Sequence, residues 1–104
     1  MIAIAGIGGI GSNAAQNLIR FGISSLLIGD FDCVEESNLN RQFYFYDQIG
    51  QKKTDSLEIN LKRINPSAVI YKMNKKFVFP EDINLFEECE IIIEGFDQVA
   101  DKIS

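Results

Sequence analysis

A run of glycines near the amino terminus is the first part of this sequence that could do chemistry. The segment Gly6-Ile7-Gly8-Gly9-Ile10-Gly11 has the spacing G-x-G-x-x-G. Because glycine has no Cβ atom, such a loop can turn tightly and bring backbone N–H groups and a helix end close to a phosphate. The glycines are therefore predicted to bind a nucleotide. The alternative is a turn that only lets a helix pack closely on a strand. The four glycines of this prediction are Gly6, Gly8, Gly9 and Gly11.

An acidic residue stands where a nucleotide site of this kind needs one. Asp30 lies nineteen residues after Gly11, a distance typical of the carboxylate that accepts hydrogen bonds from ribose hydroxyls. The alternative role for Asp30 is to cap a turn. Asp32, two residues later, could brace the loop without touching a ligand.

Two basic residues bear on which nucleotide fits. Arg41 lies in a polar loop, and Lys53 follows twelve residues later. The glycine loop can hold the two phosphates of a dinucleotide. A triphosphate carries about two more negative charges, which an Arg and a Lys in one crevice would balance. The pair favours ATP, with an NAD- or FAD-dependent oxidoreductase as the alternative. Arg41 could instead form an exposed ion pair with Glu35 or Glu36, worth about 0–1 kcal/mol, and we expect Lys52 to be solvated.

The composition excludes several other kinds of site. The 104 residues contain no His, so a Ser-His-Asp triad, a His general base and a His metal ligand are all impossible. Cys33 and Cys89 form no CxxC pair, so neither a zinc site nor a disulfide framework is expected. A net charge of −5 argues against a nucleic-acid partner, because neutralising phosphates takes clustered Lys and Arg.

The overall balance of residues is that of one globular domain, 46% hydrophobic and 24% charged. No apolar run approaches the roughly 20 residues that cross a bilayer. No basic segment precedes the first apolar run, as it would in a secretory signal. We expect a single cytoplasmic domain over residues 1–104 that makes no membrane contact.

Four short apolar runs predict the strands that would position these side chains. They lie at residues 2–5, 26–28, 68–71 and 91–93. Because the last run is apolar on both faces, it indicates a parallel sheet covered by helices. The fold class predicted is α/β, a Rossmann-like, doubly wound and mostly parallel sheet.

Helical spacing and breaks in the pattern predict the connections. Helices are expected at 12–21 and from Lys53 to about Ile64, and a short helical or irregular piece at 81–88. Residues 31–50 are predicted to be a long ordered loop with a short helical turn, and loops of this length tend to be functional. Its aromatic residues are expected to pack beneath the loop rather than stack on a base: Phe43, Tyr44, Phe45 and Tyr46.

A further helix is expected to begin near Asp97, only about two turns before Ser104. The chain is therefore expected to be the N-terminal nucleotide-binding half of a larger fold.

These motifs, in this order, resemble the ThiF/MoeB family, the bacterial relatives of ubiquitin-activating enzymes, and most of all the short ThiF-type proteins of thiamine biosynthesis. The resemblance spans nearly the whole chain, from Ile2 to about Gln98. The residues that carry it are GIGGIGS at 6–12, Asp30-Phe31-Asp32, SNLNRQ at 37–42, IGQKK at 49–53, RINP at 63–66, and Asp97.

The resemblance implies an ATP-dependent adenylyltransferase. The C-terminal glycine carboxylate of a ubiquitin-fold sulfur carrier such as ThiS would attack the α-phosphorus of ATP, giving an acyl-adenylate. Asp30 would then hold the ribose, and Arg41 and Lys53 would contact phosphates during catalysis. Asp97 would bind Mg²⁺ next to Gln98 at the nucleotide, with helix capping as its alternative role. The segment wrapping the ATP would be Ser37, Asn38, Leu39, Asn40 and Arg41.

The resemblance also implies a homodimer. Some family features have no match in these 104 residues, including an Arg ahead of the first strand and zinc-binding cysteine pairs. Two further alternatives remain, a tRNA-modifying dehydratase of the same superfamily and a non-catalytic interaction module.

Overall fold

The computed structural model describes residues 1–95, and Asp97 and Gln98 lie outside this range. Four strands form one sheet in the order β3-β2-β1-β4. All three neighbouring pairs are parallel, so the expected Rossmann-like α/β architecture is confirmed. The strands are β1 (Ile2–Ala5), β2 (Ser25–Gly29), β3 (Val69–Met73) and β4 (Ile91–Glu94).

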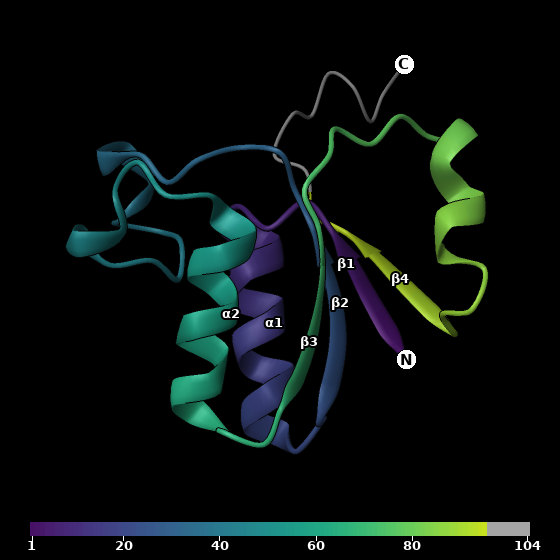
Figure 1. The fold of residues 1–104 in the computed structure, drawn as a ribbon, viewed down its shortest axis with the longest axis horizontal. Helices are drawn as coiled ribbons and strands as arrows, with labels where there is room; N and C mark the ends of the chain where they lie inside the picture. The colour runs from purple at the N-terminus through teal and green to yellow at the C-terminus, as the bar shows by residue number, and fades with distance from the viewer. Residues whose placement is uncertain (96–104) are drawn as a thin grey trace.

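The two helices cover one face of the sheet (Figure 1). They are α1 (Gly9–Phe21) and α2 (Lys53–Ile64). Apolar side chains recurring at helical spacing face the strands and form the larger core, since their burial removes apolar surface from water. Fully buried members of this core are Ile4, Ile7, Ala15, Leu26, Ile28, Leu57 and Leu61.

The chain after β3 crosses to the other face of the sheet (Figure 1). This connection contains the 3₁₀ helix η3 (Glu81–Phe86) and packs a smaller core of Ala3, Ala5, Leu27, Phe77 and Phe86. It then returns to place β4 beside β1. From β1 the chain adds β2 and β3 on one side of this strand and β4 on its other side. Folds of this kind bind ligands at the carboxyl ends of the two strands where the order switches, which here are β1 and β4.

Three expectations differ from the structure in detail. Helix α1 begins at Gly9, three residues earlier than predicted, because the glycines themselves form its first turn. The long loop contains two 3₁₀ turns, η1 (Glu36–Asn38) and η2 (Tyr46–Gln48). The expected burial of β4 on both faces is wrong, since Ile91 is 53% exposed on a strand that pairs only with β1 among the described residues.

None of the helices in residues 1–95 has the length and apolar character needed to cross a lipid bilayer.

Candidate functional site

The glycine loop joins β1 to α1 and is shaped by close backbone contacts. Gly6 has φ 92°, in the left-handed region that favours glycine, and its N–H donates to Gly29 O at 2.7 Å. A Cβ atom on Gly11 would overlap the carbonyl oxygen of Gly6, and one on Gly95 would meet both Gly6 and Gly11. The loop therefore lies tightly against the ends of β1 and β4, with no room for a side chain at Gly11 or Gly95.

The start of α1 carries no counter-charge of its own. Within residues 1–95, no side chain caps this helix, and no acidic residue lies in its first turn. The first N–H groups of a helix lack partners within the helix, and the helix dipole makes this end partly positive. An anion such as a phosphate is the group that suits these unpartnered donors.

Asp30 follows β2 and fixes the shape of the crevice. Its Oδ2 accepts a hydrogen bond from Ile7 N at 2.9 Å. Its Oδ1 accepts from Phe31 N at 2.7 Å and from Asp32 N at 3.0 Å. The turn-capping role considered for Asp30 is therefore present. A carboxylate has about four lone-pair positions, so Oδ2 can still accept a hydroxyl.

Tyr44 lies beneath the same loop and was not expected to be part of the site. Its hydroxyl donates to Ile7 O at 2.7 Å, although 37 residues separate the two in sequence. Ile7 is fully buried, so Asp30 and Tyr44 together satisfy both of its backbone polar groups. Burial raises the pKa of the Tyr44 phenol, and the nearby Asp30 carboxylate raises it further, so the hydroxyl keeps its proton.

Lys53, the first residue of α2, is a buried cation. It is 5% exposed, and its backbone N–H donates to Asp32 O at 3.0 Å. Its ammonium lies 6.0 Å from the centre of the Tyr44 ring. Within residues 1–95, Lys53 forms no ion pair with a carboxylate. A buried charge that makes no close ion pair is costly, and such groups cluster at binding sites.

Asp32 is close enough to Lys53 for their charges to interact. Partial desolvation raises the pKa of the Asp32 carboxyl, as does Asp30, while Lys53 lowers it. The two groups are not in contact as an ion pair, so the Lys53 charge remains available to a ligand.

Arg41 is brought to the glycine loop through its backbone. The Asn13 amide nitrogen donates to Gly9 O at 2.7 Å and to Arg41 O at 2.7 Å. One residue earlier on α1, the hydroxyl oxygen of Ser12 accepts from Phe43 N at 3.0 Å. The first turn of α1 thus holds the 41–43 segment against the glycine loop.

The segment predicted to wrap a nucleotide, residues 37–41, forms η1 and the turn after it. The Asn38 side chain is used within this turn, since its oxygen accepts from Glu35 N at 2.8 Å. Ser37, Asn40 and Arg41 are exposed, and Leu39 is half-buried. The alternative ion pair of Arg41 with Glu35 or Glu36 is not formed; neither acid lies within ion-pair distance of a cation in the described part of the chain.

Gln42 leaves one buried polar atom without a partner. Its Oε1 receives no hydrogen bond, although buried acceptors are normally satisfied. Gln42 follows Arg41 directly in the chain. A hydrogen-bond donor from a ligand or from water would satisfy its Oε1.

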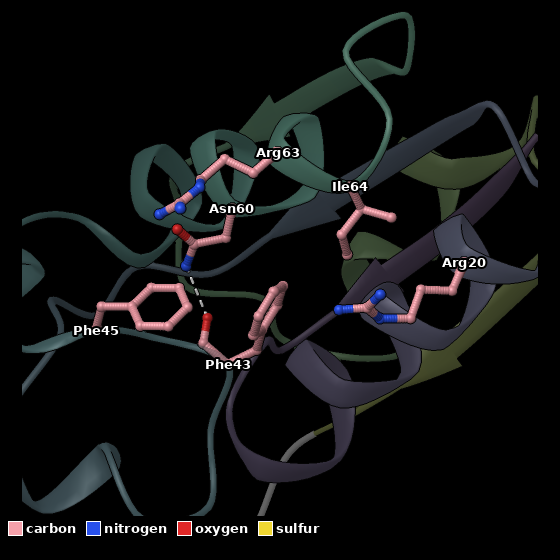
Figure 2. Close-up of a pocket in the computed structure, with 6 residues that line it drawn as sticks. All are labelled: Arg20, Phe43, Phe45, Asn60, Arg63 and Ile64. Carbon is pink, nitrogen blue, oxygen red and sulfur yellow. Dashed lines mark hydrogen bonds between the residues drawn. The ribbon is translucent and has the colours of Figure 1, made fainter.

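The aromatic residues of the long loop divide between packing and exposure. Phe43 is half-buried and Tyr44 buried, as expected for packing beneath the loop, whereas Phe45 and Tyr46 are exposed. Behind them lies an open groove of about 390 Å³ between the helix ends, lined by Arg20, Phe43, Phe45, Asn60, Arg63 and Ile64 (Figure 2). This groove does not include any predicted nucleotide-binding residue.

The Mg²⁺ that the resemblance implies would need carboxylate ligands beside the nucleotide. The described residues contain no group of three Cys, Asp or Glu side chains that could hold a metal ion. Mg²⁺ beside a nucleotide usually takes one or two carboxylates together with phosphate oxygens, so a cluster of three is not required. The predicted ligand Asp97, like Gln98, lies outside the described range.

Sequence reasoning missed two contributors to the site, Asn13 and Tyr44. Asn13 follows directly after the GIGGIGS segment, and its amide is what joins Gly9 to Arg41. Tyr44 was noted only as an aromatic packing residue. A buried tyrosine needs a partner for its hydroxyl, but no sequence pattern says which carbonyl supplies it.

Known proteins are similar to this chain in sequence. Ubiquitin-like modifier-activating enzyme 5 of Arabidopsis thaliana is 51% identical over 69 residues, which are 66% of this chain and 16% of that protein. The Drosophila melanogaster protein of the same name is 39% identical over 99% of this chain and 22% of its own length. The chain thus spans less than a quarter of these relatives.

Solved structures show the same fold with a nucleotide bound. The E. coli tRNA N6-threonylcarbamoyladenosine dehydratase TcdA, in complex with ATP, has a TM-score of 0.84 and 32% identity, covering 94% of this chain and 41% of that one. In this chain hydrogen bonds join the glycine loop to the aspartate after β2 and, through Asn13, to Arg41 of the SNLNRQ segment. The family model described as the ThiF family matches residues 1–103, and the chain belongs to that family.

Proposed function

We propose that this chain is the ATP-binding part of an adenylyltransferase that activates the C-terminal carboxylate of a ubiquitin-like protein. The observation that carries the proposal is the buried Lys53 ammonium, which has no carboxylate partner in the described structure. It lies over Tyr44, which in turn binds the glycine loop. A polyphosphate would supply the missing negative charge.

The reaction proposed is an in-line transfer of the adenylyl group. A carboxylate oxygen of the protein substrate forms a bond to the α-phosphorus, the bond from that phosphorus to the bridging oxygen breaks, and pyrophosphate leaves. No proton has to move in this step. Such reactions depend on positioning and charge stabilisation, which suits a chain that has no His.

Each part of the site has a separate task in this scheme. The start of α1 binds phosphate oxygens, and Asp30 accepts a ribose hydroxyl while it braces Ile7. Lys53 and Arg41 contact phosphates and stabilise the charge that develops on pyrophosphate. Asp97 would hold Mg²⁺, whose chemistry is to neutralise phosphate charge.

The protein substrate is the finer part of the proposal. The resemblance to short ThiF-type proteins favours a ThiS-like sulfur carrier of thiamine biosynthesis as the substrate. It also favours a homodimeric form of this enzyme, located in the cytoplasm. Relatives that are 51% and 39% identical to this chain are instead named ubiquitin-like modifier-activating enzymes. Both kinds of substrate present a carboxylate at the end of a ubiquitin fold, so the chemistry proposed is the same.

The test is ATP–pyrophosphate exchange by the full-length protein, with a ThiS-like carrier and a ubiquitin-like modifier offered separately. We expect exchange only when the correct carboxylate is present. We expect Lys53→Met to reduce it by about 100-fold, the size seen when a transition-state charge donor is removed.

Lys52→Met is the matched control. Lys52 is the exposed neighbour of Lys53, so the same substitution there should leave the exchange rate nearly unchanged. Equal loss of exchange in both variants would contradict the role of Lys53. Binding of NADH without binding of ATP would overturn the adenylyltransferase proposal.

A further inference from the structure

Tyr44 touches two parts of the proposed ATP site that are distant in sequence. We infer that Tyr44 is a positioning residue, whose hydroxyl aims the glycine loop and whose ring places the Lys53 ammonium. This inference rests on the proposed function, because it concerns how the same site is held ready for a polyphosphate.

The hydroxyl acts on the peptide unit between Ile7 and Gly8. Tyr44 donates to Ile7 O at 2.7 Å, and that oxygen belongs to the same planar unit as the N–H of Gly8. In a trans peptide the C=O and N–H point in opposite directions. Fixing the oxygen toward Tyr44 therefore holds the Gly8 N–H pointing away from the Tyr44 hydroxyl.

The peptide unit between Ile7 and Gly8 needs a contact that fixes its orientation, because it borders glycine. Gly8, with φ −81° and ψ −136°, is the residue that directly precedes α1. Glycine can reorient its neighbouring peptide at little cost. Asp30 holds the other side of Ile7 through its N–H. Among residues 1–95, the side-chain hydrogen bond to the peptide unit that Gly8 shares comes from Tyr44.

The ring acts on Lys53. The ammonium lies 6.0 Å from the ring centre, at the outer range of a cation–π contact. Tyr44 is 4% exposed and Lys53 5% exposed, so the two side chains restrict one another in a packed environment. The ring thus limits where the ammonium can lie when no anion is bound.

The two contacts can be separated by substitution in the full-length protein. Tyr44→Phe removes the hydroxyl and keeps the ring, whereas Tyr44→Leu removes both. Gly8 is buried, so its N–H exchanges with water only when the loop opens. In the nucleotide-free protein we expect amide hydrogen exchange at Gly8, followed by NMR, to be about tenfold faster in both variants, because neither retains the hydroxyl that holds the loop.

Nucleotide affinities, measured by calorimetry, report the second contact. We expect Tyr44→Phe to weaken ATP and AMP binding by similar factors of about ten, because both ligands offer a phosphate to the loop. Tyr44→Leu should also lower the ratio of ATP to AMP affinity, by about threefold, because Lys53 addresses the additional phosphates.

Two controls separate positioning from general stability. Tyr46→Phe removes an exposed hydroxyl, and Leu61→Val destabilises the buried core of α2 at a residue that is fully buried. We expect neither control to change Gly8 exchange or the ATP-to-AMP ratio.

The outcomes are distinguishable. If wild-type protein binds no ATP, the proposed function fails, whereas exchange at Gly8 still decides the loop contact. If wild-type protein binds ATP and Tyr44→Phe matches it in affinity and in Gly8 exchange, the role of the hydroxyl is overturned. An unchanged ATP-to-AMP ratio in Tyr44→Leu overturns the role of the ring.

Discussion

At the scale of single residues, Lys53 shows how a binding site can oppose stability. The ammonium is buried without a carboxylate partner in the described structure. Removing a charge from water costs free energy unless another charge compensates it. The folded protein without ligand therefore bears a cost that an anion would relieve.

A stability measurement can test this cost. Methionine has a similar length and no charge, so Lys53→Met is expected to raise the free energy of unfolding of the ligand-free protein by about 1 kcal/mol. Urea denaturation measures the change, and ATP should then stabilise the variant less than the wild type. A lower free energy of unfolding in Lys53→Met would show that the ammonium is already well compensated.

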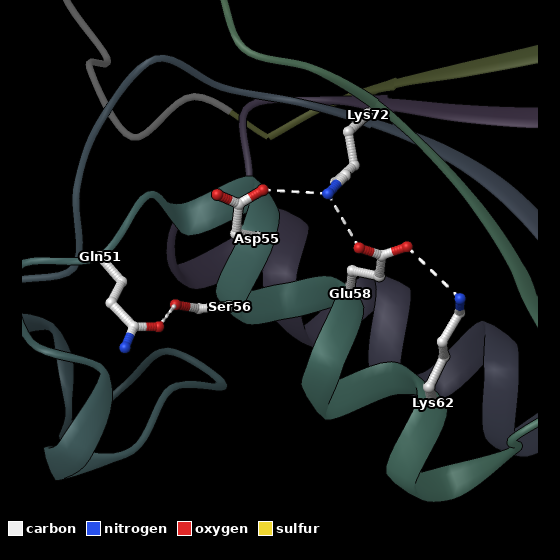
Figure 3. A network of polar contacts seen from close by, with 6 residues as sticks. All are labelled: Gln51, Asp55, Ser56, Glu58, Lys62 and Lys72. Carbon is white, nitrogen blue, oxygen red and sulfur yellow. Dashed lines mark hydrogen bonds and ion pairs between the residues drawn. The ribbon is translucent and has the colours of Figure 1, made fainter.

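At the scale of elements, an ion-pair network fixes α2 against β3 (Figure 3). Lys72 on β3 lies 3.0 Å from Asp55 and 2.9 Å from Glu58, both on α2. Glu58 also pairs with Lys62 at 3.4 Å, one turn along the helix. Since α2 begins at Lys53, the network helps to hold the helix that carries this cation.

The network predicts a pH-dependent stability. The hydrogen bond from Lys72 lowers the pKa of Glu58 below its ordinary 4.5, and the bond to Glu58 raises the pKa of Lys72. A lowered carboxyl pKa contributes stability above the ordinary pKa, and this is lost as pH falls through the folded-state value. Lys72→Met should therefore cost about 0.5–1 kcal/mol at pH 7, because the pairs are partly exposed.

The difference between Lys72→Met and wild type should shrink as pH falls below about 4.5, the ordinary Glu58 value. The contribution of Lys72 itself is present below its ordinary pKa of 10.5 and is lost as pH rises through its raised value. Lys62→Met serves as the control, with an expected cost of about 0.3 kcal/mol. Urea denaturation between pH 3 and 8 measures both variants, and a difference independent of pH would contradict the assignment.

At the scale of the whole molecule, three glycines join the ends of the sheet to the first helix. Gly6 follows β1, Gly11 lies in α1, and Gly95 follows β4. A Cβ atom on either of the last two would meet the Gly6 backbone. The crevice at the switch in strand order therefore depends on the absence of these side chains.

Alanine at Gly11 should damage both fold and function. The added methyl group would meet backbone rather than a flexible side chain. We therefore expect the free energy of unfolding to fall by more than about 2 kcal/mol, and we expect no measurable nucleotide binding. Thermal unfolding and calorimetry test this. Gly22→Ala is the control, because Gly22 has φ 118° but open space around it. We expect this variant to lose about 1 kcal/mol of its free energy of unfolding and to keep normal nucleotide affinity.

The sequence by itself determined the order of elements, the parallel sheet and the glycine loop. Each of these depends on local information: apolar runs of strand length, helical spacing, and glycines between a strand and a helix. The resemblance to the ThiF family, confirmed over residues 1–103, also followed from short motifs. The roles proposed for Arg41 and Lys53 remain predictions that the nucleotide experiments address.

Tertiary structure decided the remaining features, because they depend on contacts between distant residues. Only the folded chain shows that Tyr44 binds Ile7 across 37 positions, or that Asn13 joins Gly9 to Arg41. The exposure of Ile91 on β4 likewise depends on what packs beside that strand, not on its apolar composition. Local sequence sets the conformation and the inward face of an element, but the partner of a buried group is fixed only when elements far apart in the chain are packed together.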